Sequence, residues 1–297
     1  MLDVRRLTLL RELHHRGTIA AVAEALHQSP SSVSQQLSVL EREVGVRLLD
    51  KVGRRLQLTP QAEILVAHTE VVLERLERAE TELEQSLATA AGTIRVGLFQ
   101  SAALTLLPAV LRRLAVDHPM LRVQTHQREP EAALADTSIG DFDLVVAEQY
   151  PGHAAAWHAR LDRQPLVADA IALAVPREGP FASVGAVSDA AAAAWTMEPD
   201  EVASRHWAEQ ACRQAGFEPD VRYETTDLRA QIDLVAAGFA VAFIPGLMAP
   251  AVPAGVRLVT LAGDPRRQVF TATRPSMVDN PAVRAVRSAL ASAAGLG

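Results

Sequence analysis

The sequence predicts an α/β protein with an all-α-plus-wing head: an N-terminal winged helix-turn-helix, a long linker helix and a C-terminal α/β domain of two lobes. Its 297 residues exceed one small domain and suggest two or three units. The first 59 residues have the periodicity of short helices followed by a hairpin. Beyond residue 91, strand and helix patterns alternate, which is typical of an α/β domain.

Charge is distributed unevenly along the chain, whose net charge is −6. Residues 1–59 contain nine basic and six acidic side chains, whereas residues 60–91 contain two basic and seven acidic ones. A basic head on an acidic body is expected when only the head meets a polyanion such as nucleic acid.

The sequence also bears on location. No stretch of about 18 apolar residues occurs without charge, so no membrane partner is expected. The first residues, "MLDVRRLTLLRELHHRG", are amphipathic and charged and do not resemble a secretory signal. We therefore expect a cytoplasmic protein.

The head begins with three helices. Leu9, Leu10 and Leu13 mark the inner side of the first, and a second begins near Thr18 with apolar residues at helical spacing: Ile19, Val22, Ala23 and Leu26. Ser29 and Pro30 suit the N-cap and first position of a third helix. Because only about three residues separate the second and third helices, the pattern predicts a helix-turn-helix.

The third helix has two faces of opposite character. One is apolar: Val33, Leu37, Leu40 and Val44. The other holds short hydroxyls and an amide, which can bond to base edges and phosphates in a major groove: Ser31, Ser34, Gln35 and Ser38, with Pro30 at the start. An ordinary solvated face is the alternative, but such faces usually hold Glu and Lys, as at Glu41 and Glu43. DNA contact is therefore the favoured interpretation.

A hairpin follows in "RLLDKVGRRLQLT", with Gly53 at its turn. Arg54 and Arg55 lie at the predicted tip, within reach of phosphates or a narrow minor groove. A hairpin directly after the helix-turn-helix makes the head a winged helix.

A long helix is predicted from Thr59 to about Ala91. Its heptad-like seam includes polar positions: Leu65, Thr69, Val72, Leu76, Ala79, Leu83 and Ser86. Packing of a single helix on its own domain is the alternative, but so acidic a helix has few other ways to bury this seam. We therefore expect it to form a dimer, which holds two heads at a fixed separation.

The remaining chain alternates strands, such as "TIRVGLF", "FDLVVAE" and "FAVAFIP", with helices. This alternation predicts mostly parallel sheets with right-handed crossovers. Two such units joined by crossing strands leave a crevice at the carboxyl ends of strands, where ligands usually bind.

The head segment from Gly17 to Pro60 resembles the winged helix-turn-helix of LysR-type transcriptional regulators, and later segments such as "LVAAGFAVAFIP" follow the family's order and spacing. The resemblance implies that the C-terminal part is a periplasmic-binding-protein-like effector domain. It implies double-stranded promoter DNA and a small-molecule effector as partners. It also implies self-assembly as a dimer or as a dimer of dimers, a homotetramer. It also implies domain bounds: a DNA-binding domain over 1–59, a linker over 60–91, and an effector domain over 92–297 with lobe I at 92–163 plus 267–297 and lobe II at 164–266.

Candidate effector contacts bracket the expected crevice, and each has a capping or surface role as its alternative. They are Gln100, Ser101, Arg128, Glu148, Glu198, Thr225 and Thr226. Backbone amides at Gln100 and Ser101 open a helix and suit a polar group. The mixture of Arg128 with Glu148 and Glu198 suggests a small zwitterionic or polar metabolite.

An enzyme is not expected, because the sequence has no G-x-S-x-G elbow, no phosphate-binding glycine loop and no H-E-x-x-H motif. No catalytic residue, metal site or cofactor is predicted. Cys212, the single cysteine, is interpreted as a packing residue and not as a redox sensor. A transport binding protein would need an export signal. The stronger rival is a ligand-independent, architectural DNA-binding protein, which needs only the head and linker.

Overall fold

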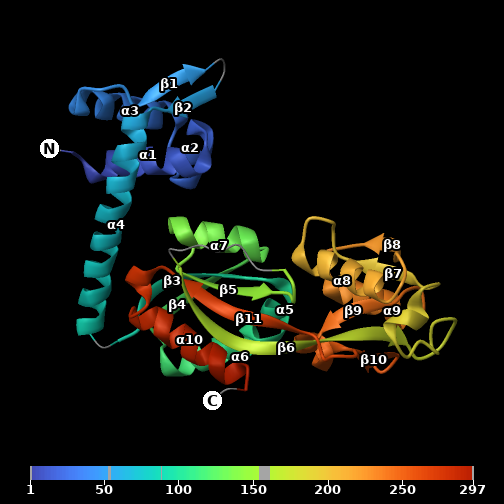
Figure 1. Cartoon of the computed structure of the whole chain (residues 1–297). Coiled ribbons are helices and arrows are strands. Elements are labelled where there is room, and N and C mark those ends of the chain that lie inside the picture. The colour runs from blue at the N-terminus through green and yellow to red at the C-terminus, as the bar shows by residue number, and fades with distance from the viewer. Residues whose placement is uncertain (1, 53–54, 88, 154–160, 296–297) are drawn as a thin grey trace. The chain divides into compact units, whose positions relative to one another are not determined.

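The computed structural model describes residues 2–52, 55–87, 89–153 and 161–295 (Figure 1). The chain forms two compact units, residues 1–83 and 84–297. No helix in the described part of the chain has the length and apolarity that crossing a membrane requires.

The first unit contains the three predicted helices, the hairpin and most of the long helix. The elements are α1 (Val4–Arg16), α2 (Ile19–Ala25), α3 (Pro30–Val44), β1 (Leu49–Val52), β2 (Arg55–Leu58) and α4 (Pro60–Ser86). Gly17, at φ 74°, ends α1 in the left-handed conformation that glycine adopts without strain. Thr18 then caps α2, its side chain accepting a hydrogen bond from the backbone N–H of Ala21 at 3.1 Å. The winged helix-turn-helix is confirmed.

The core of this unit is apolar and draws on every helix, including the first turns of α4. Buried side chains come from α1, α2 and α3, and Leu48, Ala62 and Val66 complete the cluster. The base of α4 therefore packs on the head itself, because its first apolar residues close the core that the shorter helices leave open.

The predicted seam of α4 is divided by this packing. Leu65 packs against the core of the head, and Thr69, one turn on, is buried and donates its hydroxyl to the carbonyl of Leu65 at 2.7 Å, so the first positions belong to the head. Farther along, large apolar side chains are exposed in the single chain: Val71, Val72, Leu76 and Leu83. The prediction of one continuous seam is wrong for its first positions, since these already have a partner within the head.

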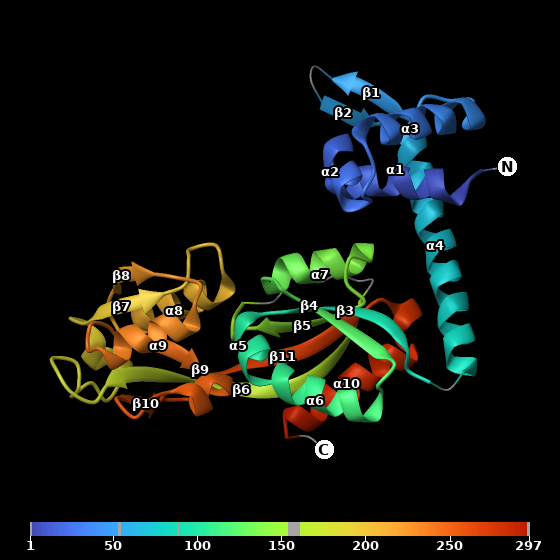
Figure 2. The ribbon, with the colours of Figure 1, turned by 180° about the vertical axis from the view of Figure 1, so that it is seen from behind.

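The first lobe of the second unit is a sheet covered by helices on both faces (Figures 1 and 2). Its parallel strands are β3 (Gly92–Leu98), β4 (Leu121–Gln127) and β5 (Leu144–Gln149). The helices are α5 (Gln100–Thr105), α6 (Leu107–Asp117), α7 (Pro130–Ile139) and α10 (Pro281–Ala293). Apolar residues of α6 and α10 cover one face of the sheet, and those of α7 cover the other.

The second lobe is smaller and holds two short sheets. Its elements are η1 (Val187–Ala190), β7 (Ala194–Met197), α8 (Ala203–Gln214), β8 (Asp220–Glu224), α9 (Leu228–Ala236), β9 (Ala242–Pro245), η2 (Gly246–Ala251) and β10 (Val256–Thr260). Trp195 is fully buried at its centre, and its indole N–H donates to the carbonyl of Ala190 at 3.3 Å. Alternating strands and helices thus build each lobe, as predicted.

Two long strands join the lobes: β6 (Asp162–Pro176) and β11 (Arg266–Thr273). The first part of β6 pairs with β11 as far as Ala170, and its last part pairs with β9 and β10. The ladder between β6 and β11 is interrupted by a β-bulge between Val269 and Phe270. After β11, η3 (Pro275–Met277) leads into α10, whose N-cap is the predicted Asn280.

The expectation of mostly parallel sheets is wrong. β6 pairs antiparallel with β9, β10 and β11, and β11 also pairs antiparallel with β5. Because the chain crosses between lobes in both directions, its crossing strands run against their neighbours. The predicted strand near residue 170 is the second half of a continuous 15-residue strand.

Candidate functional site

The polar face of α3 is exposed to solvent, as its sequence predicts. Pro30, Ser31, Ser34, Gln35 and Ser38 are exposed, and we name this set the reading face. On the opposite side Val33, Leu37 and Leu40 are buried in the head. Among the described residues no side-chain hydrogen bond engages the Gln35 amide, so both its donor and its acceptor are available.

Side-chain bonds fix where α3 begins and how it is oriented. The Ser29 hydroxyl accepts from the backbone N–H of Ser32 at 3.2 Å, which caps the helix ahead of Pro30. From α1, Arg6 donates to the Gln36 side-chain oxygen at 3.1 Å and pairs with Glu43. These contacts lie beside the reading face and leave it uncovered.

Glu41 has a role that the sequence did not reveal. Its carboxylate accepts from the backbone N–H groups of Leu48 and Leu49, at 2.8 and 3.1 Å. Glu41 and Glu43 therefore are not simply solvated charges, because one holds the start of the hairpin and the other binds Arg6. The hairpin is thus anchored directly to the helix that presents the reading face.

The hairpin pairs as predicted, with Leu49 opposite Leu58 in antiparallel register. Its expected turn residue, Gly53, and the tip residue Arg54 lie outside the described residues. Arg55 opens β2, and its backbone is in register with Val52. The contribution of these arginines to DNA binding stays a prediction.

In the second unit, Gln100 connects the two lobes. From the start of α5 its side-chain N–H donates to Asp227 Oδ1 at 3.0 Å, and its side-chain oxygen accepts from the backbone N–H of Leu228 at 2.8 Å. Thr225 lies nearby and accepts from the Asp227 backbone N–H at 3.1 Å. The predicted residues Gln100 and Thr225 are thereby brought to one place, where both serve the protein's own hydrogen bonds, and Thr226 lies between Thr225 and Asp227 in the chain.

A buried arginine that the sequence analysis missed organises the cleft between the lobes. Arg267, on β11, is 1% exposed and donates to Ser101 Oγ at 2.8 Å and to Asp169 Oδ2, also at 2.8 Å. It also pairs with Glu148. Although burial alone lowers it, the pKa of Arg267 is raised by Glu148, Tyr150 and Asp169. Ser101 and Glu148, both predicted, therefore meet through this guanidinium.

Asp169 extends this network to the second lobe. Its Oδ1 accepts from the backbone N–H of Leu247 at 2.8 Å. Gly246 permits this approach, since a Cβ there would lie 2.7 Å from that oxygen. A signal for Asp169 was present in the sequence, because it is a charged residue within an otherwise apolar strand pattern, whereas Arg267 stands between Arg266 and Gln268.

A cavity of about 60 Å³ lies between the lobes, and we name it the acidic cavity. Its lining is Glu129, Pro130, Glu131, Glu148, His153, Glu198, Glu201, Val202, Ala203 and Ser204. Glu148 and Glu198, both among the candidate effector contacts, line this one space. Arg128 is not among these residues; it pairs with Asp136 of α7 at 2.9 Å, so the predicted mixture of charges is not assembled there.

The acidic cavity raises the pKa values of the carboxyls around it. Burial, assisted by the charges of Glu148 and Glu129, raises the pKa of Glu198 to about 7, although the Ser204 hydroxyl donates a hydrogen bond to this carboxylate. Burial also raises the pKa of Glu129 and Glu148. In this cleft, burial and neighbouring negative charge therefore oppose ionisation of the carboxyls.

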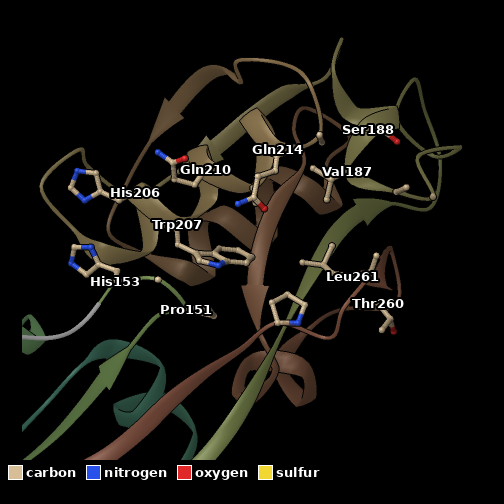
Figure 3. A pocket seen from close by; sticks show the side chains of 17 residues that line it. Pro151, His153, Val187, Ser188, His206, Trp207, Gln210, Gln214, Thr260 and Leu261 are labelled. Carbon is tan, nitrogen blue, oxygen red and sulfur yellow. The ribbon is translucent and has the colours of Figure 1, made fainter.

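A much larger hollow of about 1260 Å³ lies on the second lobe (Figure 3). Trp207, Gln210 and Gln214 of α8 line it, and His153 stacks on His206 at one end, with ring centroids 5.7 Å apart. Most of its lining comes from the second lobe. A ligand there would contact few groups of the first lobe and would have less influence on how the lobes are arranged.

Cys212 is fully buried in the core of the second lobe. Burial, with the nearby charges of Glu209 and Glu218, raises the pKa of its thiol to about 12. Since the thiolate is the reactive form, this environment is that of a packing residue, as predicted.

Comparison with known proteins covers almost the whole chain. Residues 4–63 match the family described as "Bacterial regulatory helix-turn-helix protein, lysR family", and residues 88–295 match "LysR substrate binding domain". The transcriptional dual regulator GltC of Bacillus subtilis is 27% identical over 82% of this chain and 81% of its own. The transcriptional dual regulator OxyR of Escherichia coli is 26% identical over 92% of this chain and 90% of its own.

Solved structures share the fold. A full-length OxyR variant from Pseudomonas aeruginosa superposes with a TM-score of 0.70 at 18% identity, covering 98% of this chain and 95% of its own. Full-length CbnR complexed with its target DNA gives a TM-score of 0.55 at 19% identity, covering 98% and 100%. With the winged head, the free reading face and the two-lobed domain described, this chain belongs to the LysR family of bacterial transcriptional regulators.

Proposed function

We propose that this regulator reads promoter DNA with the reading face of α3 and changes its hold on that DNA when a small molecule binds between the lobes. The observation that supports it best is the exposure of Ser31, Ser34, Gln35 and Ser38 on one side of a helix whose other side is buried. Hydroxyls and amides in a major groove can distinguish bases, and Gln pairs well with adenine.

The interlobe cleft is the proposed effector site. Gln100 and Arg267 join groups of both lobes there, and a ligand that replaces or adds such contacts favours one lobe arrangement over another. The ligand can change the free energy of DNA binding only by as much as its own binding free energy differs between the two lobe arrangements. DNA changes the binding free energy of the ligand by the same amount.

Peroxide sensing is not proposed, although several relatives are named as hydrogen peroxide-inducible genes activators. Such chemistry needs an accessible thiolate. Cys212 is buried and its raised pKa keeps it a thiol, which favours a metabolite as the effector.

Self-association through α4 supports the proposed DNA mode. The exposed side chains of Val72, Leu76 and Leu83 provide an apolar stripe for a second copy. Two heads then reach half-sites about one helical turn apart. Dimers, or dimers of these dimers, acting on the chromosome in the cytoplasm follow from this proposal.

A ligand-independent architectural role remains the alternative, and DNA binding tests both. Full-length protein is titrated against its own upstream region and against scrambled DNA at equal salt. We expect Gln35→Ala to lower the preference for the operator by about 5- to 100-fold. The matched control, Gln61→Ala, alters an exposed glutamine of α4 and should leave the preference unchanged. Equal binding of both DNAs by the wild type contradicts specific regulation.

A further inference from the structure

The acidic cavity between the lobes has an unusual set of charges. Five glutamates line it, from the start of α7, the end of β5 and the loop before α8: Glu129, Glu131, Glu148, Glu198 and Glu201. Of the described residues that line this space, none is lysine or arginine, and His153 is the one that can become cationic. An anion placed here would be repelled from several directions.

Nearby arginines offset these carboxylates only in part, because each of them also pairs with acidic groups outside the cavity lining. Arg267 is shared by Glu148 and Asp169, so this buried trio has one positive and two negative groups. Arg205, at the start of α8, pairs with Asp200, Glu209 and Glu224. Glu198 instead receives a neutral hydroxyl donor from Ser204. The carboxylates therefore leave room for a positive group supplied by a ligand.

A buried polar atom that lacks a hydrogen-bond partner within the described residues lines the adjoining space. A second cavity of about 30 Å³ shares Glu198 and Ser204 with the acidic cavity and is lined also by Thr196 and Tyr150. Thr196 is 0% exposed, and its Oγ1 has no hydrogen-bond partner within the described residues. Burying a hydroxyl unpaired costs on the order of 1–3 kcal/mol, so a site that leaves it open favours a ligand or water that bonds to it.

Size and geometry indicate the kind of positive group. A cavity of about 60 Å³ accommodates a head group but not a whole metabolite. No group of three or more acidic, histidine or cysteine side chains in the described residues is arranged to hold a metal ion. An ammonium has three donors and a guanidinium five, which suit carboxylates spread around a space and a hydroxyl beyond them.

We propose that the effector is an organic cation whose primary ammonium or guanidinium group binds in the acidic cavity, among Glu129, Glu148 and Glu198. This inference rests on the proposed function, because it names the chemical class of ligand for the same cleft. An organic cation takes the place of the zwitterionic or polar metabolite expected from the sequence, because Arg128 forms an ion pair with Asp136 and does not line the cavity.

Calorimetric titration of the full-length protein with four compounds of similar length tests the charge requirement. Agmatine and butane-1,4-diamine supply the cationic groups, butane-1,4-diol is neutral, and succinate is anionic. We expect both cations to bind at least about 10-fold more tightly than the diol, a difference of about 1.4 kcal/mol, with succinate undetected. If neither cation binds at concentrations up to about 10 mM, the proposal is overturned.

Two matched variants test whether agmatine binds in the acidic cavity. Glu198→Gln keeps the size of the side chain and removes its charge, so the affinity for agmatine should fall at least about 10-fold. Glu178→Gln changes an exposed glutamate outside the cavity lining and should leave that affinity unaltered. Melting curves show whether each variant is folded. Unchanged agmatine affinity in folded Glu198→Gln also overturns the proposal.

Failure of this inference is distinguishable from failure of the proposed function. If succinate binds, and Glu198→Gln strengthens its binding, the cleft stands as the effector site and the cationic class is wrong. If agmatine binds as expected but leaves operator affinity unchanged, the class is supported and ligand control of DNA binding is contradicted.

Discussion

Gln100 and Asp227 are joined across the two lobes by a hydrogen bond of 3.0 Å, although 127 residues separate them in the chain. The same glutamine accepts from the Leu228 backbone N–H. This side chain therefore binds the start of α5 to the start of α9, and it reports on how the lobes are arranged.

Removal of this link should loosen the start of α9. In Gln100→Ala the Leu228 N–H loses its acceptor, and its hydrogen exchange should accelerate by about 10-fold, as expected from one hydrogen bond. Exchange mass spectrometry or NMR measures this. Gln127→Ala, at an exposed glutamine that ends β4, is the control. Unchanged protection in Gln100→Ala would show that the bond does not hold the lobes.

Two adjacent arginines on β11 should differ sharply in their effect on stability. Arg267→Met leaves Glu148 and Asp169 without their shared cation and should lower the free energy of unfolding by about 3–5 kcal/mol. Arg266 is half-exposed and pairs with Asp264, so Arg266→Ala should change the free energy of unfolding by less than about 1 kcal/mol. Urea unfolding of both variants checks this, and similar losses would contradict the assigned importance of the buried trio.

Glu41 should stabilise the hairpin through its carboxylate. Glu41→Ala leaves the N–H groups of Leu48 and Leu49 without this acceptor, and the head should lose about 1–3 kcal/mol of unfolding free energy. Glu41→Gln keeps an acceptor oxygen and should recover part of the loss. If Gln and Ala are equally damaging in denaturant titrations, charge and not hydrogen bonding is responsible.

Glu198 should make stability depend on pH. Its pKa rises from 4.5 to about 7 on folding, so between these values the folded protein holds more protons than the unfolded chain. Its contribution is therefore present in acid and is lost as the pH rises to about 7. Glu129 and Glu148 have raised pKa values too, while Arg267 opposes the rise and Ser204 donates to Glu198. Subtracting the unfolding free energy of Glu198→Gln from that of the wild type at each pH isolates the contribution of Glu198. If the two curves of unfolding free energy against pH are parallel, the prediction is refuted.

The exposed part of α4 should control dimerisation. Leu76→Asp places a charge in the apolar stripe and should weaken the dimer by at least about 10-fold in sedimentation equilibrium. Glu80→Asp, at an exposed position one turn on, keeps the charge and should have little effect. A Leu76→Asp protein that remains fully dimeric at low concentration would locate the interface elsewhere.

Local patterns predicted the head well and the cleft incompletely. Ser29, Pro30 and the apolar spacing of α3 act within a few residues, so their roles can be inferred from neighbours along the chain. Arg267 and Asp169 are 98 residues apart, and their pairing depends on strand register, which periodicity does not specify. The same limit concealed Glu41, whose partners lie in the next element, and the antiparallel course of β6.

The course of β6 through both lobes bears on where one lobe can move against the other. β6 pairs with β11 as far as Ala170 and with β9 from Ile171 on, so backbone ladders hold this strand on both sides of the point where it passes from one lobe to the other. Movement of one lobe against the other is therefore concentrated at the short passage between Ala170 and Ile171, where one ladder ends and the next begins.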